Sequence, residues 1–339
     1  MLQTEWNWTV AADLLLSGAG AVLLVVASLL CLAGKREAHT RLVVRCAWTG
    51  TAAIALGVLF LLADVGQKLR ALNMFASFGN FATSWMPRGA WSLALAIICG
   101  IALAAAATDA LETRLRFLAP LYRWQHRNML IGVLAVVEVL LGCFITFYTG
   151  MLVMSSSGIP FWTSPWLPTC FVLASALVGT AGAAALATVR NENESRDVVR
   201  VLAGVSLASA VLLAAALGAY LTSSLNAGEA GASAMASVVV ASAEELVSGQ
   251  FAPVFWVVLV GIGIAVPAVA NVATIASSPS GALARRIPTI ALAGVLCALC
   301  GGFALRWLVL AVGLHMQVLL PGVTQLADGT MFTYLSFIA

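Results

Sequence analysis

The sequence predicts an all-α integral membrane protein with eight transmembrane helices, arranged as two four-helix bundles with both termini outside. Hydrophobic residues make up 62% of the chain and charged residues only 9%, whereas a soluble domain carries about 25% charged residues. Basic residues also gather in alternate loops, as expected of a multi-pass protein. The net charge of +3 is spread over short loops, so we expect a lipid bilayer as partner and no nucleic acid.

The apolar runs are each long enough to cross a bilayer, which needs about 20 residues. We predict spans at 10–33, 47–66, 88–108, 129–152, 168–189, 199–222, 253–276 and 288–312. The N-terminus lacks the basic stretch and cleavage site of a signal peptide, so we expect the first span to be retained. Residues 1–190 are assigned to a first bundle, spans one to four plus five. Residues 191–339 are assigned to a second bundle, in which spans six to eight pack with span five.

Arginine and lysine positions predict the orientation. Basic residues concentrate in the loops 34–46, 109–128, 190–200 and 277–287. The positive-inside rule places these loops in the cytoplasm and both termini on the outer, periplasmic side of a bacterial or archaeal inner membrane. Of the outer segments, 159–168 is expected to be a non-helical cap and 223–252 to contain a short helix around 233–247. Tryptophans near the outer ends indicate a docking surface in addition to an aromatic belt.

Four polar residues fall near the predicted outer ends of the first spans: Asp13, Asp64, Arg88 and Tyr148. A carboxylate at bilayer depth costs roughly 2.5–3.5 kcal/mol without a partner, so we interpret the group as one site. Simpler interpretations stay open for each member. Asp13 is also typical of an N-cap or first-turn carboxylate stabilised by the helix dipole. Asp64 has Lys68 or Arg88 as possible ion-pair partners, and Tyr148 alone is typical of an interfacial anchor.

Deeper in the membrane, Glu138 lies in the middle of the fourth span, roughly 15 Å from Tyr148 by helical rise. An ionisable residue there is a functional hypothesis by default. We predict a proton path through Glu138 towards Asp109 on the inner side. A structural, hydrogen-bonded Glu138 is the alternative. Arg306, next to Trp307 in the last span, is interpreted as a side chain that snorkels outward.

The outer site has the groups that a quinol headgroup requires. A quinol needs a hydrogen-bond donor at one oxygen, a titratable acceptor at the other, and an apolar entrance for its tail. Tyr148, Asp13 and Asp64 supply the polar groups. The three histidines and seven cysteines show no haem-ligand pair and no cluster spacing, and Cys297 and Cys300 are interpreted as packing residues. We therefore expect no haem or iron–sulfur cluster in this chain.

Two segments carry a family resemblance. Segment 63–91 resembles the membrane subunits of the polysulfide reductase/NrfD family through Asp64, Gly66, Ser84, Trp85, Met86, Arg88, Gly89 and Trp91. A second motif, similar to that of the same family, runs from Tyr148-Thr149-Gly150 to Trp166–Pro168. Trp6-Asn7-Trp8 with 17–20 resembles its first helix. The family's helix-one histidine and asparagine correspond here to Asp13 and Val10, which leaves the quinone type and the proton acceptor open.

The resemblance implies a (mena)quinone-reactive anchor of a respiratory oxidoreductase complex. It implies an outer pocket in the first bundle, for which we name Asp13, Asp64, Gln67, Arg88 and Tyr148. It also implies a periplasmic four-cluster iron–sulfur subunit as partner and usually a molybdopterin catalytic subunit. Two other functions remain. A proton or small-molecule transporter would place polar residues and broken helices at the midplane, whereas a purely structural anchor would work without Asp13 or Asp64.

Overall fold

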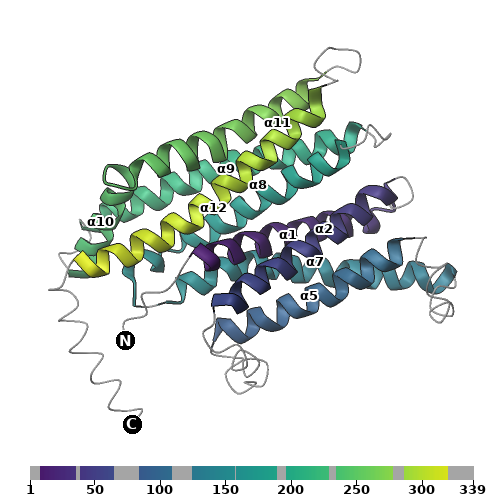
Figure 1. The fold of residues 1–339 in the computed structure, drawn as a ribbon, viewed down its shortest axis with the longest axis horizontal. Helices are drawn as coiled ribbons and strands as arrows, with labels where there is room; N and C mark the ends of the chain where they lie inside the picture. The colour runs from purple at the N-terminus through teal and green to yellow at the C-terminus, as the bar shows by residue number, and fades with distance from the viewer. Residues whose placement is uncertain are drawn as a thin grey trace, which may run out of the picture.

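The computed structural model describes residues 8–35, 39–64, 84–108, 124–156, 158–188, 196–228, 234–277 and 286–319. Every regular element in these ranges is a helix (Figure 1). Eight of the described helical stretches are long and apolar enough to cross a membrane. The predicted all-α membrane fold is therefore confirmed.

The first four spans are α1 (Trp8–Leu32), α2 (Thr40–Asp64), α5 (Trp85–Ala107) and α7 (Trp124–Met154). Each begins before the predicted start, α2 by seven residues, because a helix can continue beyond the apolar run that hydropathy detects. Arg41 and Arg45, expected in a loop, therefore lie in the first turns of α2.

The remaining spans are α8 (Trp166–Thr188), α9 (Arg196–Leu225), a π-helical stretch η5 (Val254–Ala265) that continues into α11 (Val266–Ala276), and α12 (Ile287–Leu319). The predicted short helix is present as α10 (Ala234–Val247), next to a 3₁₀ turn η4 (Asn226–Gly228). The predicted non-helical cap is wrong in part, because Pro160–Thr163 forms a 3₁₀ turn, η3, for which proline at the first position is well suited.

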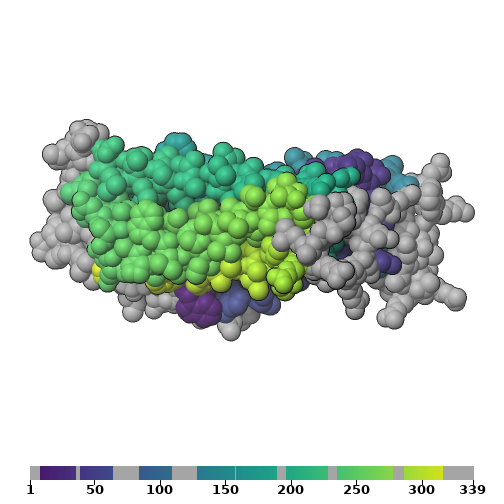
Figure 2. Space-filling model, turned by 90° about the horizontal axis from the view of Figure 1, so that it is seen from above, coloured from purple at the N-terminus to yellow at the C-terminus, as the bar shows by residue number. Residues whose placement is uncertain are grey.

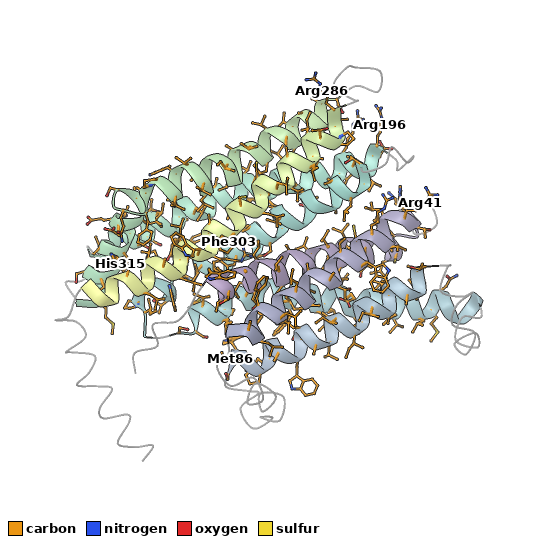
Figure 3. All side chains as sticks on the ribbon, viewed as in Figure 1. Arg41, Met86, Arg196, Arg286, Phe303 and His315 are labelled. Atoms are coloured by element: carbon orange, nitrogen blue, oxygen red, sulfur yellow. The ribbon has the colours of Figure 1, made fainter. Side chains whose placement is uncertain are left out.

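The spans alternate in direction, so the molecule has two ends. Arg41, Arg196 and Arg286 lie at one end and Met86 and His315 at the other (Figure 3). We call the first end the arginine face. The other end, where α1 starts at Trp8, is called the Trp8 face. Three of the four basic loops thus share one face, as predicted, and the fourth lies mostly outside the described residues.

The helices form two groups that contact each other. The first group contains α1, α2, α5 and α7, and the second contains α8, α9, η5/α11 and α12 (Figure 1). In the space-filling view, helices of the second group cover one long side of the molecule (Figure 2). Because α8 packs against α1 and α7 as well as α9 and α12, the two groups share a continuous interface.

Glycines allow the closest helix contacts. A Cβ added at Gly20 of α1 would lie 2.6 Å from the Gly50 carbonyl oxygen of α2, and one added at Gly50 would lie 2.7 Å from the Gly20 oxygen. In the second group a Cβ on Gly301 of α12 would collide with the backbone of Gly263 in η5. Small residues at such contacts are typical of helix packing in membranes. The outer surface is apolar, with Ile98, for example, 63% exposed.

Candidate functional site

Asp13 lies in the interior of the helix group near the Trp8 face. It is the sixth residue of α1 and is 4% exposed. Its carboxylate Oδ1 accepts a hydrogen bond of 2.8 Å from the Ser17 hydroxyl, one turn further along α1. Because α1 starts at Trp8, the interpretation of Asp13 as a first-turn carboxylate is wrong. Asp13 is instead a buried carboxylate whose polar neighbour is Ser17.

Helix α2 closes over this carboxylate. A Cβ added at Gly57 would lie 2.9 Å from Asp13 Oδ1 and 2.7 Å from Ser17 Oγ. At this position of α2, only glycine leaves enough space for the two polar groups of α1. Gly57 therefore makes room for the buried pair of Asp13 and Ser17.

Tyr148 reaches the same region from α7. It is 5% exposed, and its ring lies directly on Gly89 of α5, where an added Cβ would overlap the ring. The Tyr148 hydroxyl and the Asp13 carboxylate are near enough to interact electrostatically. The structure thus brings Asp13 and Tyr148, which are far apart in sequence, into one buried cluster. Tyr148 is not an interfacial anchor, because its side chain is inside the protein.

Arg88 stands at the edge of this cluster. It lies in the first turn of α5, and its guanidinium carbon is 4.9 Å from the centroid of the Trp85 ring. Trp85 stacks on Phe144 at 6.4 Å between centroids, and Phe144 stacks on Tyr148 at 6.3 Å. A continuous row of aromatic rings thus connects the Arg88 cation to the Tyr148 phenol.

Three predicted site residues cannot be placed in the same way. Helix α2 ends at Asp64, as expected for the end of an apolar run, but the Asp64 side chain lies outside the described part of the structure. Gln67 and Asp109 also fall outside the described residues. Their roles, and the alternative pairing of Asp64 with Lys68 or Arg88, remain predictions.

Glu138 lies on α7, deep in the first group. It is fully buried, and neither carboxylate oxygen has a hydrogen-bond partner among the described groups. The Cys99 thiol of α5 is close enough to interact with it electrostatically. A hydrogen bond from a neighbouring helix, the alternative considered for Glu138, is absent from this described region.

Arg306 was interpreted wrongly from the sequence. It has no exposed surface, and it lies 19 residues after the start of α12 and 13 before its end, too far from the end for its side chain to reach water. The guanidinium instead donates to Ser175 Oγ of α8 at 2.7 Å and to the Gly302 carbonyl at 2.9 Å, and it lies 5.1 Å from the Phe171 ring centroid. Gly302, one turn before Arg306 in α12, is the sequence signal for close packing here, because a Cβ added to it would lie 3.6 Å from Arg306 Nη1.

The buried guanidinium joins the two helix groups near Asp13. A Cβ added at Gly18 of α1 would lie 3.4 Å from Arg306 Nη2 and would collide with Ser175 Oγ. Arg306 also interacts electrostatically with Asp13. The charge of the Asp13 carboxylate therefore has a buried positive counterpart, which is supplied by the second group.

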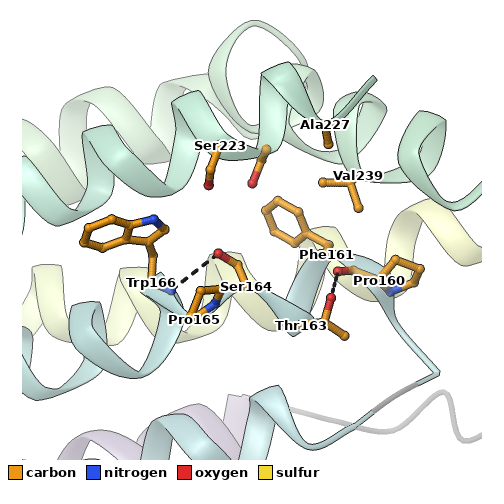
Figure 4. Close-up of a pocket in the computed structure, with 10 residues that line it drawn as sticks. Pro160, Phe161, Thr163, Ser164, Pro165, Trp166, Ser223, Ala227 and Val239 are labelled. Carbon is orange, nitrogen blue, oxygen red and sulfur yellow. Dashed lines mark hydrogen bonds between the residues drawn. The ribbon is translucent and has the colours of Figure 1, made fainter. Parts of the chain in front are cut away.

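A groove opens at the Trp8 face of the second group. Its volume is about 310 Å³, and it is lined by Pro160, Phe161, Thr163, Ser164, Pro165, Trp166, Ser223, Ser224, Ala227 and Val239 (Figure 4). The lining lacks charged side chains and combines aromatic rings with hydroxyl groups. The groove lies where the two outer segments singled out from the sequence, 159–168 and 223–252, come together.

These features first define a class. The chain is a multi-pass membrane protein whose interior holds a carboxylate and a phenol towards the Trp8 face and a guanidinium that interacts with the carboxylate. A family model described as polysulphide reductase, NrfD, matches residues 2–318. The chain therefore belongs to the NrfD family, as its motifs suggested.

Membership of the family carries a general function. NrfD proteins are membrane subunits of oxidoreductase complexes that interact with quinones, and they assemble with other oxidoreductase subunits. No curated protein matches the chain. Among the described residues no group of three or more His, Cys, Asp or Glu side chains is placed to hold a metal ion.

Proposed function

We propose that this chain exchanges electrons and protons between a membrane quinol, such as menaquinol, and a periplasmic iron–sulfur subunit. The observation that carries the proposal is that Asp13 and Tyr148, a buried carboxylate and a buried phenol from different helices, lie within range of electrostatic interaction in the first group. Both lie towards the Trp8 face, to which Asp64, Gln67 and Arg88 are also assigned from the sequence. We assign these five residues to one quinone site.

The chemistry follows from the groups present. Oxidation of a quinol releases two protons and two electrons. Asp13 accepts a proton from one quinol oxygen, and the Tyr148 hydroxyl donates a hydrogen bond to the other. Arg88 orients the headgroup or a nearby carboxylate, and Asp64 provides a second proton acceptor. The electrons pass to the iron–sulfur clusters of the partner, and the reverse direction reduces a quinone by the same steps.

The partner is proposed to dock on the Trp8 face, which is then the periplasmic face. The concentration of arginines at the opposite end supports this orientation through the positive-inside rule. The uncharged groove around Phe161 and Trp166 has the aromatic character of interface cores. A four-cluster iron–sulfur subunit, with a molybdopterin subunit beyond it, is the expected assembly.

Glu138 is proposed to belong to a proton path from the quinone site towards Asp109 and the arginine face. Its complete burial on α7 and its lack of a hydrogen-bonded protein partner in the described region support a role other than packing. Glu138→Gln in reconstituted vesicles tests this step, with lost proton movement or slower turnover expected. Normal turnover with an unchanged proton-to-electron ratio would remove Glu138 from the mechanism.

The quinone site is tested by Asp13→Asn in the purified complex. The amide keeps the shape of the side chain but does not accept a proton, so quinol turnover is expected to fall by about 10²-fold or more while the complex still assembles. Asp197→Asn, at an exposed position in the first turn of α9, is the matched control. Unchanged quinol turnover in Asp13→Asn would reject the site and favour a purely structural anchor.

A further inference from the structure

Two completely buried polar side chains in the first group lack a hydrogen-bond partner among the residues that the structure describes. The oxygens of Glu138 and the hydroxyl of Ser28 on α1 have no hydrogen bond to any described protein group, and both residues are 0% exposed. Leaving a buried polar group unsatisfied is costly. Ser28 is an inconspicuous residue in the sequence, and nothing in its surroundings there distinguishes it.

The helix register places these two side chains at the same depth. Helices α1 and α7 run in opposite directions and touch at Gly142, where an added Cβ would collide with Val25 and lie 3.0 Å from the Ala21 carbonyl oxygen. Glu138 lies one turn from Gly142 towards the arginine face. Ser28 follows Val25 by three residues in the same direction. Because residues three, four and seven apart share a helix face, Glu138 and Ser28 both lie on the contact faces of their helices.

Apolar layers close the region on both sides. Towards the arginine face lies a small core of Leu103, Ala106 and Ile131, with Cys31 and Leu134 packed against it. Towards the Trp8 face lie Ala21, Leu24 and Ile145 of the larger core. The three polar oxygen atoms are thus enclosed in an otherwise apolar part of the bundle, with Cys99 of α5 nearby.

We propose that Glu138 and Ser28 together bind internal water molecules between α1, α5 and α7. An internal water typically makes two to four hydrogen bonds, and the two carboxylate oxygens and the hydroxyl supply three partners. The bound water gives Glu138 a local proton exchange partner within the apolar layers. The proton role rests on the proposed function, whereas the binding of water does not.

The test is infrared spectroscopy of the purified complex in H₂¹⁶O and H₂¹⁸O. Internal water gives O–H stretching bands that shift with the oxygen isotope, whereas bands of the Glu138 and Ser28 groups do not shift. We expect such a band in the native protein and expect Glu138→Gln and Ser28→Ala each to shift or remove it. Ser242→Ala is the matched control, because Ser242 is equally buried but its hydroxyl donates to the Val238 carbonyl at 2.8 Å.

Two results would overturn the water site. One is the absence of any isotope-sensitive band, which would indicate a direct contact between Glu138 and Ser28. The other is a band that is identical in Glu138→Gln, Ser28→Ala and the native protein. The band is measured without quinone, so its absence would leave the quinone proposal intact. A band with the expected changes, together with normal quinol turnover in Asp13→Asn, would instead reject the quinone site alone.

Discussion

The two helix groups bury polar side chains in different ways. In the second group, apart from Arg306 at the interface, the buried polar groups named here are neutral and paired: Asn271 donates to Ser206 Oγ at 2.8 Å, the Tyr220 hydroxyl to the Phe161 carbonyl at 2.9 Å, and Trp162 Nε1 to the Val309 carbonyl at 2.8 Å. In the first group the buried polar groups include two acids, Asp13 and Glu138.

This difference indicates that polar groups of the second group serve packing, whereas those of the first group serve the reaction. Neutral pairs inside a bundle satisfy their own hydrogen bonds and fix the arrangement of helices. A buried acid costs free energy and persists where something else favours it. The first group therefore carries the reactive side chains, while the second group acts as a scaffold that contributes one charge, Arg306, at the interface. Four substitutions test this division.

The largest effect on stability and turnover is expected at Arg306, because this residue of the second group interacts with Asp13 of the first. Arg306→Leu removes charge-assisted hydrogen bonds to Ser175 and Gly302, which are worth about 1.5–3 kcal/mol. We expect a lower melting temperature of the detergent-solubilised complex and lower quinol turnover, with partial recovery in Arg306→Lys. Arg45→Gln is the control, because Arg45 of α2 also bonds across the groups, to the Leu186 carbonyl at 3.2 Å. Equal melting temperatures in Arg306→Leu and native protein would contradict a role for this contact.

Gly57→Ala should affect turnover through the Asp13 carboxylate. The new methyl group would press on Asp13 and Ser17, and overpacking of this kind costs about 1–3 kcal/mol. Turnover with quinol is expected to fall more than the amount of assembled complex. Gly218→Ala in α9, where nothing lies within 4 Å of an added Cβ, serves as the matched change in the second group. Similar kinetics in the two variants would argue against a site at Asp13.

Tyr148→Phe should produce a smaller change. The ring keeps its contacts with Gly89 and Phe144, and only the proposed hydrogen bond to the quinol headgroup is lost, at a cost of about 0.5–1.5 kcal/mol. We expect the KM for a soluble quinol analogue to rise while the melting temperature stays close to that of the native protein. A drop in stability with unchanged KM would assign Tyr148 to packing.

Asn271→Leu should have the smallest effect, and only on stability. It removes the hydrogen bond to Ser206 in the second group, and such bonds between membrane helices average about 0.6 kcal/mol. The melting temperature is expected to fall slightly, while quinol turnover per assembled complex is unchanged. A selective loss of turnover would show that the second group takes part in the chemistry.

Much of this fold was predictable from hydropathy, because bilayer thickness sets the length of each span and every span is present. The helix ends were less predictable, since helices extend past the apolar run at Thr40–Arg45 and beyond Gly313. The same error led to the wrong interpretation of Arg306. A predicted span ending at 312 put it near the surface, whereas α12 continues to Leu319.

Asp13 and Tyr148 were predictable as candidates because a carboxylate near a membrane face is unusual. Their contacts were not, since these depend on Gly57 and Gly89, whose missing side chains leave no mark in a hydropathy pattern. Ser28 shows the same limit. Its proposed significance comes only from lying at the same depth as Glu138 on a neighbouring helix.

The π-helical stretch Val254–Ala265 has a consequence for the spacing of residues further along the chain. A π-helix holds more residues per turn than an α-helix, so it changes the angular position of everything that follows it. Deleting one residue within this stretch would turn α11 relative to α9 by the angle of one residue, which is about 100° in an α-helix and less in a π-helix. Asn271 would then point away from Ser206, and Gly263 would leave its place opposite Gly301. The length of this one segment, more than its composition, therefore keeps Asn271 opposite Ser206 and Gly263 opposite Gly301.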